Sequence, residues 1–305
     1  MTALAGQAHA QAPLASGQPI SSTESSEQDL PAAPPGQLPT GSVGGMGDVN
    51  LFPKRIVLSD RERTATVGLY NRAAASGDYD ISVNEMVMSQ DGRLTDLATV
   101  SDPAERERVR TATSFLKWSP RRVTLPANEA QMVRIMARIP ADLPHGEYRS
   151  HFLAVSVPPE TGDLSIENAI DPGPGGVGVR IMPRFGISIP IIVRVGETSL
   201  VTQLEDLAVV QRPDGAQVAT LTVTRQGTRS AFGDIMVTAP GSKKPIGEIK
   251  GVGIYTEISR RNVQIPLDPK ADPRLFAKGA KLTVSYIDDD YAPGKTLARQ
   301  EFTVP

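Results

Sequence analysis

The sequence of 305 residues contains no cysteine, so disulfide bonds and thiolate metal sites are excluded. Histidine is almost as rare, with only His9, His145 and His151. We expect His145 and His151 to be satisfied or exposed surface residues and not metal ligands. No Gly-x-Ser-x-Gly nucleophile motif is present. We therefore predict a protein that is not an enzyme, holds no metal and needs no cofactor.

An excess of charge of one sign is also missing. The 32 Lys and Arg residues nearly balance the 34 Asp and Glu residues, giving a net charge of −2. Proteins that bind nucleic acid carry a basic patch, so we predict no nucleic-acid partner. No apolar run reaches the ~18 residues that a membrane span requires, and we predict no membrane insertion.

Two further motifs are interpreted as structural. The glycine-rich stretches GGMGDV (44–49) and GPGGVG (173–178) are not followed by helix patterns, so they are not predicted to bind phosphate. The acidic stretch IDDDYAPG (287–294) lacks the alternating oxygen ligands and the terminal Glu of an EF-hand loop. We interpret it as a solvated hairpin tip.

Residues 1–46 resemble a leader followed by a tail. The opening MTALAGQAHAQA has small-x-small cleavage patterns, which favour export. The apolar stretch is short and no basic segment precedes it. Either the start codon has been placed late, or the likeness to a leader is accidental. Residues 13–46 are rich in Pro, Gly, Ser and Gln and are predicted to be disordered, because they cannot bury enough apolar surface.

Short β-rich segments separated by turn signals fill the rest of the chain. Their number and spacing predict an all-β fold with one sandwich of about seven strands over residues 47–196 and a smaller β-domain of six strands over 197–305. Only LPANEAQ and DPAERERVRTA have a helix-like composition. The strands are expected at Arg55–Ser59, Thr64–Arg72, Asp78–Ser89, two within Ser119–Pro140, Tyr148–Pro159, Ala216–Gly227, Asp234–Pro240, Ile246–Thr256, Arg261–Leu267, Ala280–Asp289 and Ala298–Val304.

One predicted strand is unusually long. The segment GGVGVRIMPRFGISIPIIVRVG (175–196) places apolar residues at nearly every odd position and a mixed, basic set at the even ones. Typical strands have about 5–6 residues. Its second half, Ile187 to Val193, is expected to be core. Its first half is either core as well or an edge that pairs with another chain.

Five stretches of the chain carry a family likeness. They are VNLFPKRIVLSDRERTATVGLYN (49–71), SPRRVTLPANEAQMVRI (119–135), LPHGEYRSHFLAVSVPP (143–159), GVGVRIMPRFGISIPIIVR (176–194) and SYIDDDYAPG (285–294). Together they resemble the periplasmic pilus-assembly chaperones of the chaperone–usher pathway. The resemblance implies two immunoglobulin-like sandwiches in an L-shaped arrangement and a periplasmic location. It also implies pilus or fimbrial subunits and an outer-membrane usher as partners.

In that family the last strand of the first domain is lent to a subunit that lacks its own final strand, which is called donor-strand complementation. The resemblance assigns this role to the apolar row Val177, Val179, Ile181 and Phe185. Such a strand needs backbone groups that are free to pair with another chain and apolar side chains that project to one side. An exposed edge also allows self-association of the free protein.

The family holds the client's C-terminal carboxylate with an arginine of the first strand and a lysine of the last. The arginine corresponds to Arg55, while the lysine position falls on Pro190. Arg184 or Arg180, which lie on the same face, are the substitutes that we consider.

A charge cluster at the domain junction is also implied, with Arg194 and Asp289 as two of its members. The third, acidic position holds Arg149, and Glu147 lies two residues earlier on the same face. The alternative to the chaperone hypothesis is an exported two-domain immunoglobulin-like structural or adhesion module whose long strand is internal.

Overall fold

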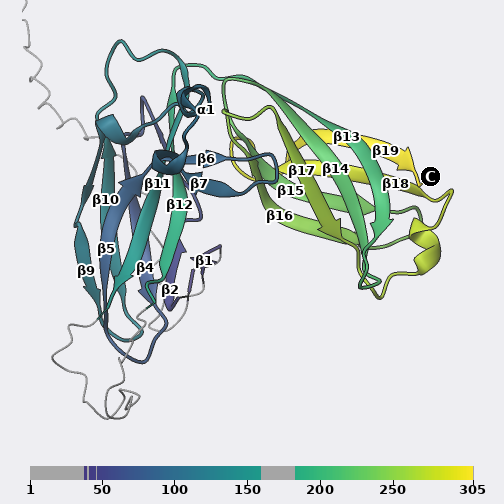
Figure 1. Cartoon of the computed structure of the whole chain (residues 1–305), viewed down its shortest axis with the longest axis horizontal. Helices are drawn as coiled ribbons and strands as arrows, with labels where there is room; N and C mark the ends of the chain where they lie inside the picture. The colour runs from purple at the N-terminus through teal and green to yellow at the C-terminus, as the bar shows by residue number, and fades with distance from the viewer. Residues whose placement is uncertain (1–37, 40, 46, 159–182, 305) are drawn as a thin grey trace, which may run out of the picture.

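A computed structural model describes residues 38–39, 41–45, 47–158 and 183–304 of the chain. It consists of two β-rich lobes that lie side by side, with the long axis of the second nearly across that of the first (Figure 1). None of the helices in the described residues is long and apolar enough to cross a membrane. The predicted class, an all-β protein with two immunoglobulin-like sandwiches, is confirmed.

The first lobe contains the elements from β1 to β12. They are β1 (Val43–Gly44), β2 (Val49–Phe52), β3 (Ile56–Ser59), β4 (Thr64–Asn71), β5 (Gly77–Asn84), β6 (Met86–Met88), β7 (Leu94–Asp96), η1 (Leu97–Thr99), α1 (Pro103–Glu107), η2 (Thr113–Phe115), β8 (Leu116–Ser119), β9 (Arg122–Leu125), β10 (Ala130–Ala137), β11 (Gly146–Val157) and β12 (Gly186–Val195).

Two five-stranded sheets form the first sandwich. Their orders are β1-β2-β4-β10-β8 and β3-β12-β11-β5-β9. Without β1 in the first sheet, and without β3 and β9 in the second, these are the A-B-E-D and G-F-C orders of an immunoglobulin fold. The first strand of the fold is divided, because β2 pairs with β4 in one sheet and β3 pairs in parallel with β12 in the other. The bend between β2 and β3 directs residues 53–55 towards the second lobe.

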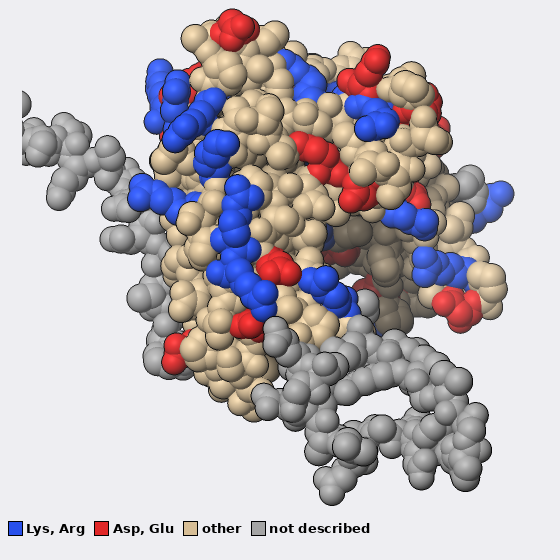
Figure 2. All heavy atoms as spheres, turned by 60° about the vertical axis from the view of Figure 1, so that its left-hand side comes forward, with Lys and Arg blue, Asp and Glu red and all other residues tan. Residues whose placement is uncertain are grey.

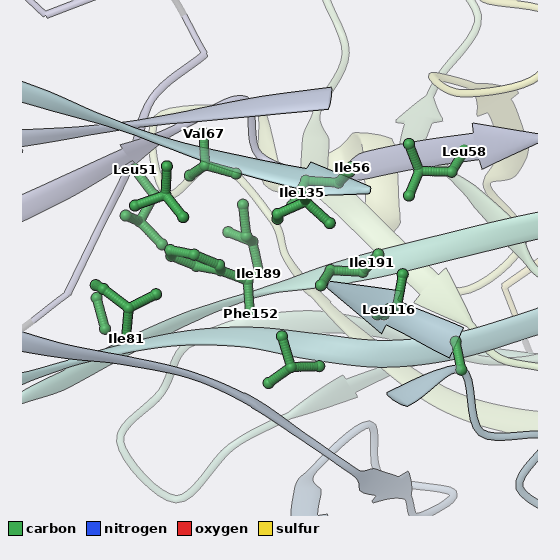
Figure 3. Close-up of a cluster of buried hydrophobic side chains, with 14 of the residues drawn as sticks. Leu51, Ile56, Leu58, Val67, Ile81, Leu116, Ile135, Phe152, Ile189 and Ile191 are labelled. Atoms are coloured by element: carbon green, nitrogen blue, oxygen red, sulfur yellow. The ribbon is translucent and has the colours of Figure 1, made fainter. Parts of the chain in front are cut away.

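Alternating side chains of both sheets fill the space between them (Figure 3). Phe152 on β11 is fully buried at the centre, with Leu51, Ile135 and Ile189 around it. Each such side chain contributes about 1.5–3 kcal/mol of burial free energy. On β10, Ile135 is buried while its neighbour Met136 is 38% exposed, as expected for a sheet with one face towards solvent.

The second lobe contains the elements from β13 to β19. They are β13 (Leu200–Gln211), β14 (Gln217–Gly227), β15 (Ala231–Thr238), β16 (Gly247–Ile254), β17 (Arg260–Pro266), η5 (Pro273–Phe276), β18 (Lys281–Asp288) and β19 (Thr296–Thr303). The sheets have the orders β13-β14-β17 and β16-β15-β18-β19, again an immunoglobulin-like arrangement.

Strand β13 was not among the six strands predicted for this lobe. Its residues alternate poorly because the ladder with β14 shifts register between Glu205 and Ala208. Asp206, at this irregularity, has a φ of 53°. The bulge adds a residue and moves the apolar positions from one parity to the other, so the segment does not show the period of two that identifies a strand.

Other predictions differ in detail from the structure. The predicted strand 78–89 is divided into β5 and β6, and the Asp91-Gly92 turn then joins β6 to β7 as expected. The helix-like DPAERERVRTA contains the short α1, which Asp102 caps by accepting a hydrogen bond from the Ala104 amide. The other helix-like fragment, LPANEAQ, forms a turn in which Asn128 has a φ of 58°.

The first sheet begins before the boundary predicted at residue 47. Strand β1, Val43–Gly44, belongs to the stretch predicted to be disordered, yet it pairs with Leu51 and Asn50 of β2. Val43 also packs against the core of the first lobe. The Pro- and Gly-rich composition concealed this strand, because a two-residue strand carries no periodic signal.

Candidate functional site

The last strand of the first sandwich is paired unequally on its two sides. Along one side, β12 pairs with β11 over its whole length, from Gly186 to Val195. On the other side, β3 pairs only with the stretch from Ile191 to Arg194. Among the described strands, residues 186–190 therefore have no ladder partner on that side. Backbone groups of an open edge are free to pair with another chain.

The side chains of β12 show which half of the strand is core. Ile187, Ile189, Ile191 and Val193 point into the sandwich and are at most 9% exposed. This confirms the expectation for the second half of the long segment. Pro190 lies at the end of the open stretch, where its missing amide removes no ladder bond to a second neighbour.

The described chain enters this edge through Pro183, Arg184 and Phe185, which are not strand residues. The Phe185 carbonyl nevertheless accepts a hydrogen bond of 2.8 Å from the Ser156 amide, and the Phe185 amide donates to the Ser156 hydroxyl at 2.9 Å. The Phe185 side chain is 41% exposed. The other members of the predicted apolar row, Val177, Val179 and Ile181, lie outside the described residues, as does Arg180.

Arg184 is engaged at the far end of the sheet. Its Nε donates to the Ser156 carbonyl at 3.0 Å and its Nη2 lies 3.3 Å from a carboxylate oxygen of Asp80. Asp80 and Arg122 continue this row of alternating charges along the outer face of the sheet. Basic and acidic side chains also stand next to one another on the face displayed in Figure 2. Exposed pairs of this kind contribute about 0–1 kcal/mol.

An apolar cluster joins the two lobes. Met88 and Ile192 of the first lobe pack with Phe232 and Tyr255 of the second, and all four are nearly fully buried. The β6–β7 hairpin extends towards the second lobe (Figure 1), where the Asn262 amide donates to the Gln90 carbonyl at 2.8 Å. These contacts hold the second lobe against the outer face of the sheet that contains β12.

Arg194 occupies the middle of a buried ion network at this junction. Its Nε lies 3.2 Å from a Glu147 carboxylate oxygen, and its Nη2 contacts Asp290 of the second lobe. Glu147 also accepts a hydrogen bond of 3.1 Å from the Ser230 amide. Although burial disfavours the charged guanidinium, Asp290 and Glu147 raise the pKa of Arg194. In the second lobe, the Arg194 side chain contacts Asp290 and not the neighbouring Asp289.

Arg55 crosses the junction beside this network. It lies immediately before β3, and its guanidinium is 3.2 Å from Asp289 and 3.3 Å from Asp290. The same group stacks over the Phe232 ring at 3.7 Å, a favourable cation–π arrangement. Lys54 also pairs with Asp289. The side chain of Arg55 is only 9% exposed. Both acidic residues engage its terminal nitrogens, while its buried Nε has no hydrogen-bond partner among the described residues.

A second buried ion pair, Arg149 with Glu257, also joins the two lobes. Arg149 donates to Glu257 at 2.5 Å, and the Met88 amide donates to the same carboxylate oxygen at 3.0 Å. Burial raises the pKa of Glu257, an effect that Arg149 opposes. The Arg149 guanidinium lies 3.7 Å above the Tyr255 ring. The basic residue at the expected acidic position thus has its own partner in the second lobe.

His151 is a buried polar residue at this junction. It is 1% exposed, and neither ring nitrogen has a hydrogen-bond partner among the described residues. The ring packs edge-on against Tyr255, with centroids 5.9 Å apart. Burial, with Arg149 nearby, lowers the pKa of His151 to about 3. The expectation of a satisfied or exposed histidine is therefore wrong for His151, although His145 is exposed.

The structure does not bring the two predicted anchor arginines together. Arg55 is next to Ile56, which lies beside Ile191 on β12. The stretch from Arg184 to Ile191 spans roughly 20 Å at ~3.3 Å per extended residue. One carboxylate cannot contact both guanidinium groups, so Arg184 does not replace the lysine whose position Pro190 occupies.

Sequence reasoning missed several residues of this junction. The stretch IDDDYAPG was interpreted as a solvated tip, with only Asp289 assigned to the junction through the family resemblance, but Asp290 is also ion-paired across the junction and Asp288 is 5% exposed. Three consecutive carboxylates at a turn were a usable signal, because such a cluster often serves a cationic partner. Glu257 and Tyr255 gave no local signal, since their partners in the first lobe lie more than 100 positions away in the sequence.

Fold and site together define a class: a two-domain immunoglobulin-like protein with a buried ionic junction and, in the first sandwich, a last strand open along half of one side. No protein-family model matches the chain, and no curated protein matches it. Among solved structures, the chain is similar to the YadV chaperone at 14% identity and a TM-score of 0.41, over 84% of this chain and 100% of that one.

Two further solved structures show a comparable likeness. The CupB2 chaperone of Pseudomonas aeruginosa is 13% identical with a TM-score of 0.40, over 82% of this chain and 97% of that one. The SafB chaperone, in complex with the SafA pilin of Salmonella enterica, is 17% identical with a TM-score of 0.39, over 86% and 99% of the two chains. These values describe a distant likeness of fold, and no function is carried over from them.

Proposed function

We propose that this protein is a periplasmic chaperone that binds pilus or fimbrial subunits by donor-strand complementation and delivers them to an outer-membrane usher. The proposal combines the resemblance of five sequence stretches to that family with one observation on the structure. This observation is the open edge of β12 at residues 186–190, which the exposed Phe185 precedes.

An open edge supports strand addition because its backbone groups supply hydrogen bonds and its alternate side chains supply specificity. The core-facing residues Ile187 and Ile189 are buried in the protein's own sandwich, so they fix the edge in place. The apolar row that a client receives therefore precedes Gly186. We assign it to Val177, Val179, Ile181 and Phe185.

We retain Arg55 alone as the client carboxylate anchor. A guanidinium suits a carboxylate because it donates two parallel hydrogen bonds. In the free protein Asp289 already accepts a hydrogen bond from Arg55 and Asp290 is ion-paired with it, so a client carboxylate has to take the place of one of them. We therefore expect client affinity to depend on the charge of Asp289, and Asp289→Asn to strengthen binding by releasing Arg55.

Periplasmic co-expression with a pilus subunit, chosen from the genes beside this one where they encode one, tests the proposal. We expect a 1:1 complex on gel filtration. Ile181→Arg and Phe185→Arg place a charge in the lent row and are expected to abolish the complex, while stability changes by less than about 0.5 kcal/mol, as is usual for surface substitutions. Met132→Arg is the matched control, since Met132 is 44% exposed on the other sheet.

Three results would count against the proposal. The wild-type protein forms no complex, or Met132→Arg disrupts it as strongly as Phe185→Arg does. In the third, Ile181→Arg unfolds the protein, which would place the first half of the long segment in the core. That result favours the alternative, an exported two-domain structural or adhesion module. The absence of pilin and usher genes beside this gene would point the same way.

A further inference from the structure

A hairpin near the start of the described chain lies beside the open edge. On the side of the first sandwich where β3 leaves residues 186–190 unpaired, the other sheet ends with β1. Strand β1 pairs with β2 through Val43–Leu51 and Gly44–Asn50. The turn between these strands is held at its base by the Asp48 carbonyl, which accepts a hydrogen bond of 2.7 Å from the Arg72 amide.

The turn contacts the edge through two glycines. A Cβ atom at Gly45 would lie 3.8 Å from the Cβ of Ile187, which is ordinary van der Waals contact. A Cβ atom at Gly47 would lie 3.0 Å from the Cβ of Phe185, which is too close without movement. The turn therefore passes directly over Phe185 and Ile187, and glycine at residue 47 permits the approach.

We infer that Val43–Gly45 and Gly47 form a cap that covers the open edge of β12 in the free protein, and that the client strand takes their place. The inference rests on the proposed function, because it names what occupies the same edge before a client arrives. A two-residue strand with two ladder pairs contributes little stability, and short segments of this kind open readily. The cap thus protects an aggregation-prone edge and remains displaceable.

An engineered disulfide tests this inference within one protein. The Cβ separation of 3.8 Å between residues 45 and 187 equals the ~3.8 Å mean for disulfides, and the chain has no other cysteine. We expect the oxidised Gly45→Cys/Ile187→Cys protein to form no complex with pilin that has been co-purified, denatured and then allowed to refold in its presence. Reduction of the same sample is expected to restore the complex, which controls for any effect of the two substitutions on folding.

Two neighbouring Gly→Ala substitutions give a second test with opposite signs. Gly45→Ala adds a contact to Ile187 and restricts the open turn, so complex formation is expected to slow by about two- to fivefold. Gly47→Ala forces the turn away from Phe185 and is expected to accelerate complex formation. Stopped-flow measurement of pilin capture, with the melting temperature of each variant, separates these effects from changes in overall stability.

The outcomes distinguish the cap from the chaperone function. If neither the wild-type protein nor the reduced double-cysteine protein captures pilin, the proposed function fails. If both capture pilin and the oxidised protein captures it at the same rate, the edge is lent without opening of the hairpin, and the cap is refuted. Equal rates for Gly45→Ala and Gly47→Ala would refute it independently.

Discussion

Replacement of His151 by phenylalanine is expected to stabilise the protein. His151 is 1% exposed, and both ring nitrogens lack partners among the described residues. A polar group buried without a hydrogen bond costs about 1–3 kcal/mol in proteins. Phenylalanine keeps the edge-on contact with Tyr255 and removes both nitrogens. We therefore expect His151→Phe to raise the free energy of unfolding by about 1–2 kcal/mol at pH 7.5.

The gain should grow as the pH falls. Burial lowers the pKa of His151 from 6.5 to about 3 in the folded protein, so between these values the unfolded chain binds a proton that the folded chain does not. Stability is therefore complete above pH 6.5 and is lost progressively as the pH decreases towards 3. At 1.36 kcal/mol per pH unit, the wild-type protein loses about 3 kcal/mol through this histidine between pH 7.5 and pH 4.5.

Urea unfolding of both proteins at pH 7.5, 6.0 and 4.5 measures the effect. Arg149, which is paired with Glu257, lies near this ring, but both residues are present in the two proteins, so the difference between them isolates His151. His151→Leu, which has a smaller side chain, controls for overpacking by the phenyl ring. A difference in unfolding free energy that stays constant from pH 7.5 to 4.5 in both variants would refute the reasoning.

Three further substitutions probe the junction and the second lobe. Glu257→Gln leaves Arg149, only 4% exposed, without a charged partner, and should cost about 3–5 kcal/mol in urea unfolding; a loss below 1 kcal/mol would contradict the buried pair. Arg55→Ala removes one of the cationic partners of Asp289 and of Asp290, which keep Lys54 and Arg194. It should cost about 1.5–3 kcal/mol, measured in the same way, whereas an unchanged midpoint would show that the contact is not stabilising. Gly233→Ala places a Cβ 1.9 Å from the Ile287 carbonyl oxygen. We expect a loss of unfolding free energy of about 4 kcal/mol or more or no soluble protein, and a normal melting curve would argue against the close approach of the paired strands β15 and β18.

Much of the fold was predictable from local pattern. Period-two alternation identified most strands of both sandwiches, because a sheet with one buried face imposes that period on the sequence. The Asp91-Gly92 turn was predictable as well, since glycine readily adopts the φ of 82° found at Gly92. The pattern failed at β13, where a bulge changes parity, and at β1, which is too short to have a period.

The candidate site was less predictable than the fold. The sequence suggested an unusual edge strand and named Arg55, Arg194 and Asp289 as charged residues of interest, but it could not tell which carboxylate each arginine meets. Ionic partners at the junction are separated by up to 235 positions in the sequence. A difference of one position separates Asp289 from Asp290 as the partner of an arginine. Side-chain pairing over such distances follows from how two complete domains pack.

By itself, the sequence determined the all-β class, the two sandwiches and the buried half of the long strand, because these depend on alternation of apolar side chains between neighbouring residues. Only the tertiary structure decided that, among the described residues, 186–190 lack a second strand partner, that a glycine hairpin lies over this edge, and that the buried ring of His151 meets no hydrogen-bond partner. Those properties depend on which remote segments lie alongside, and no local period encodes them.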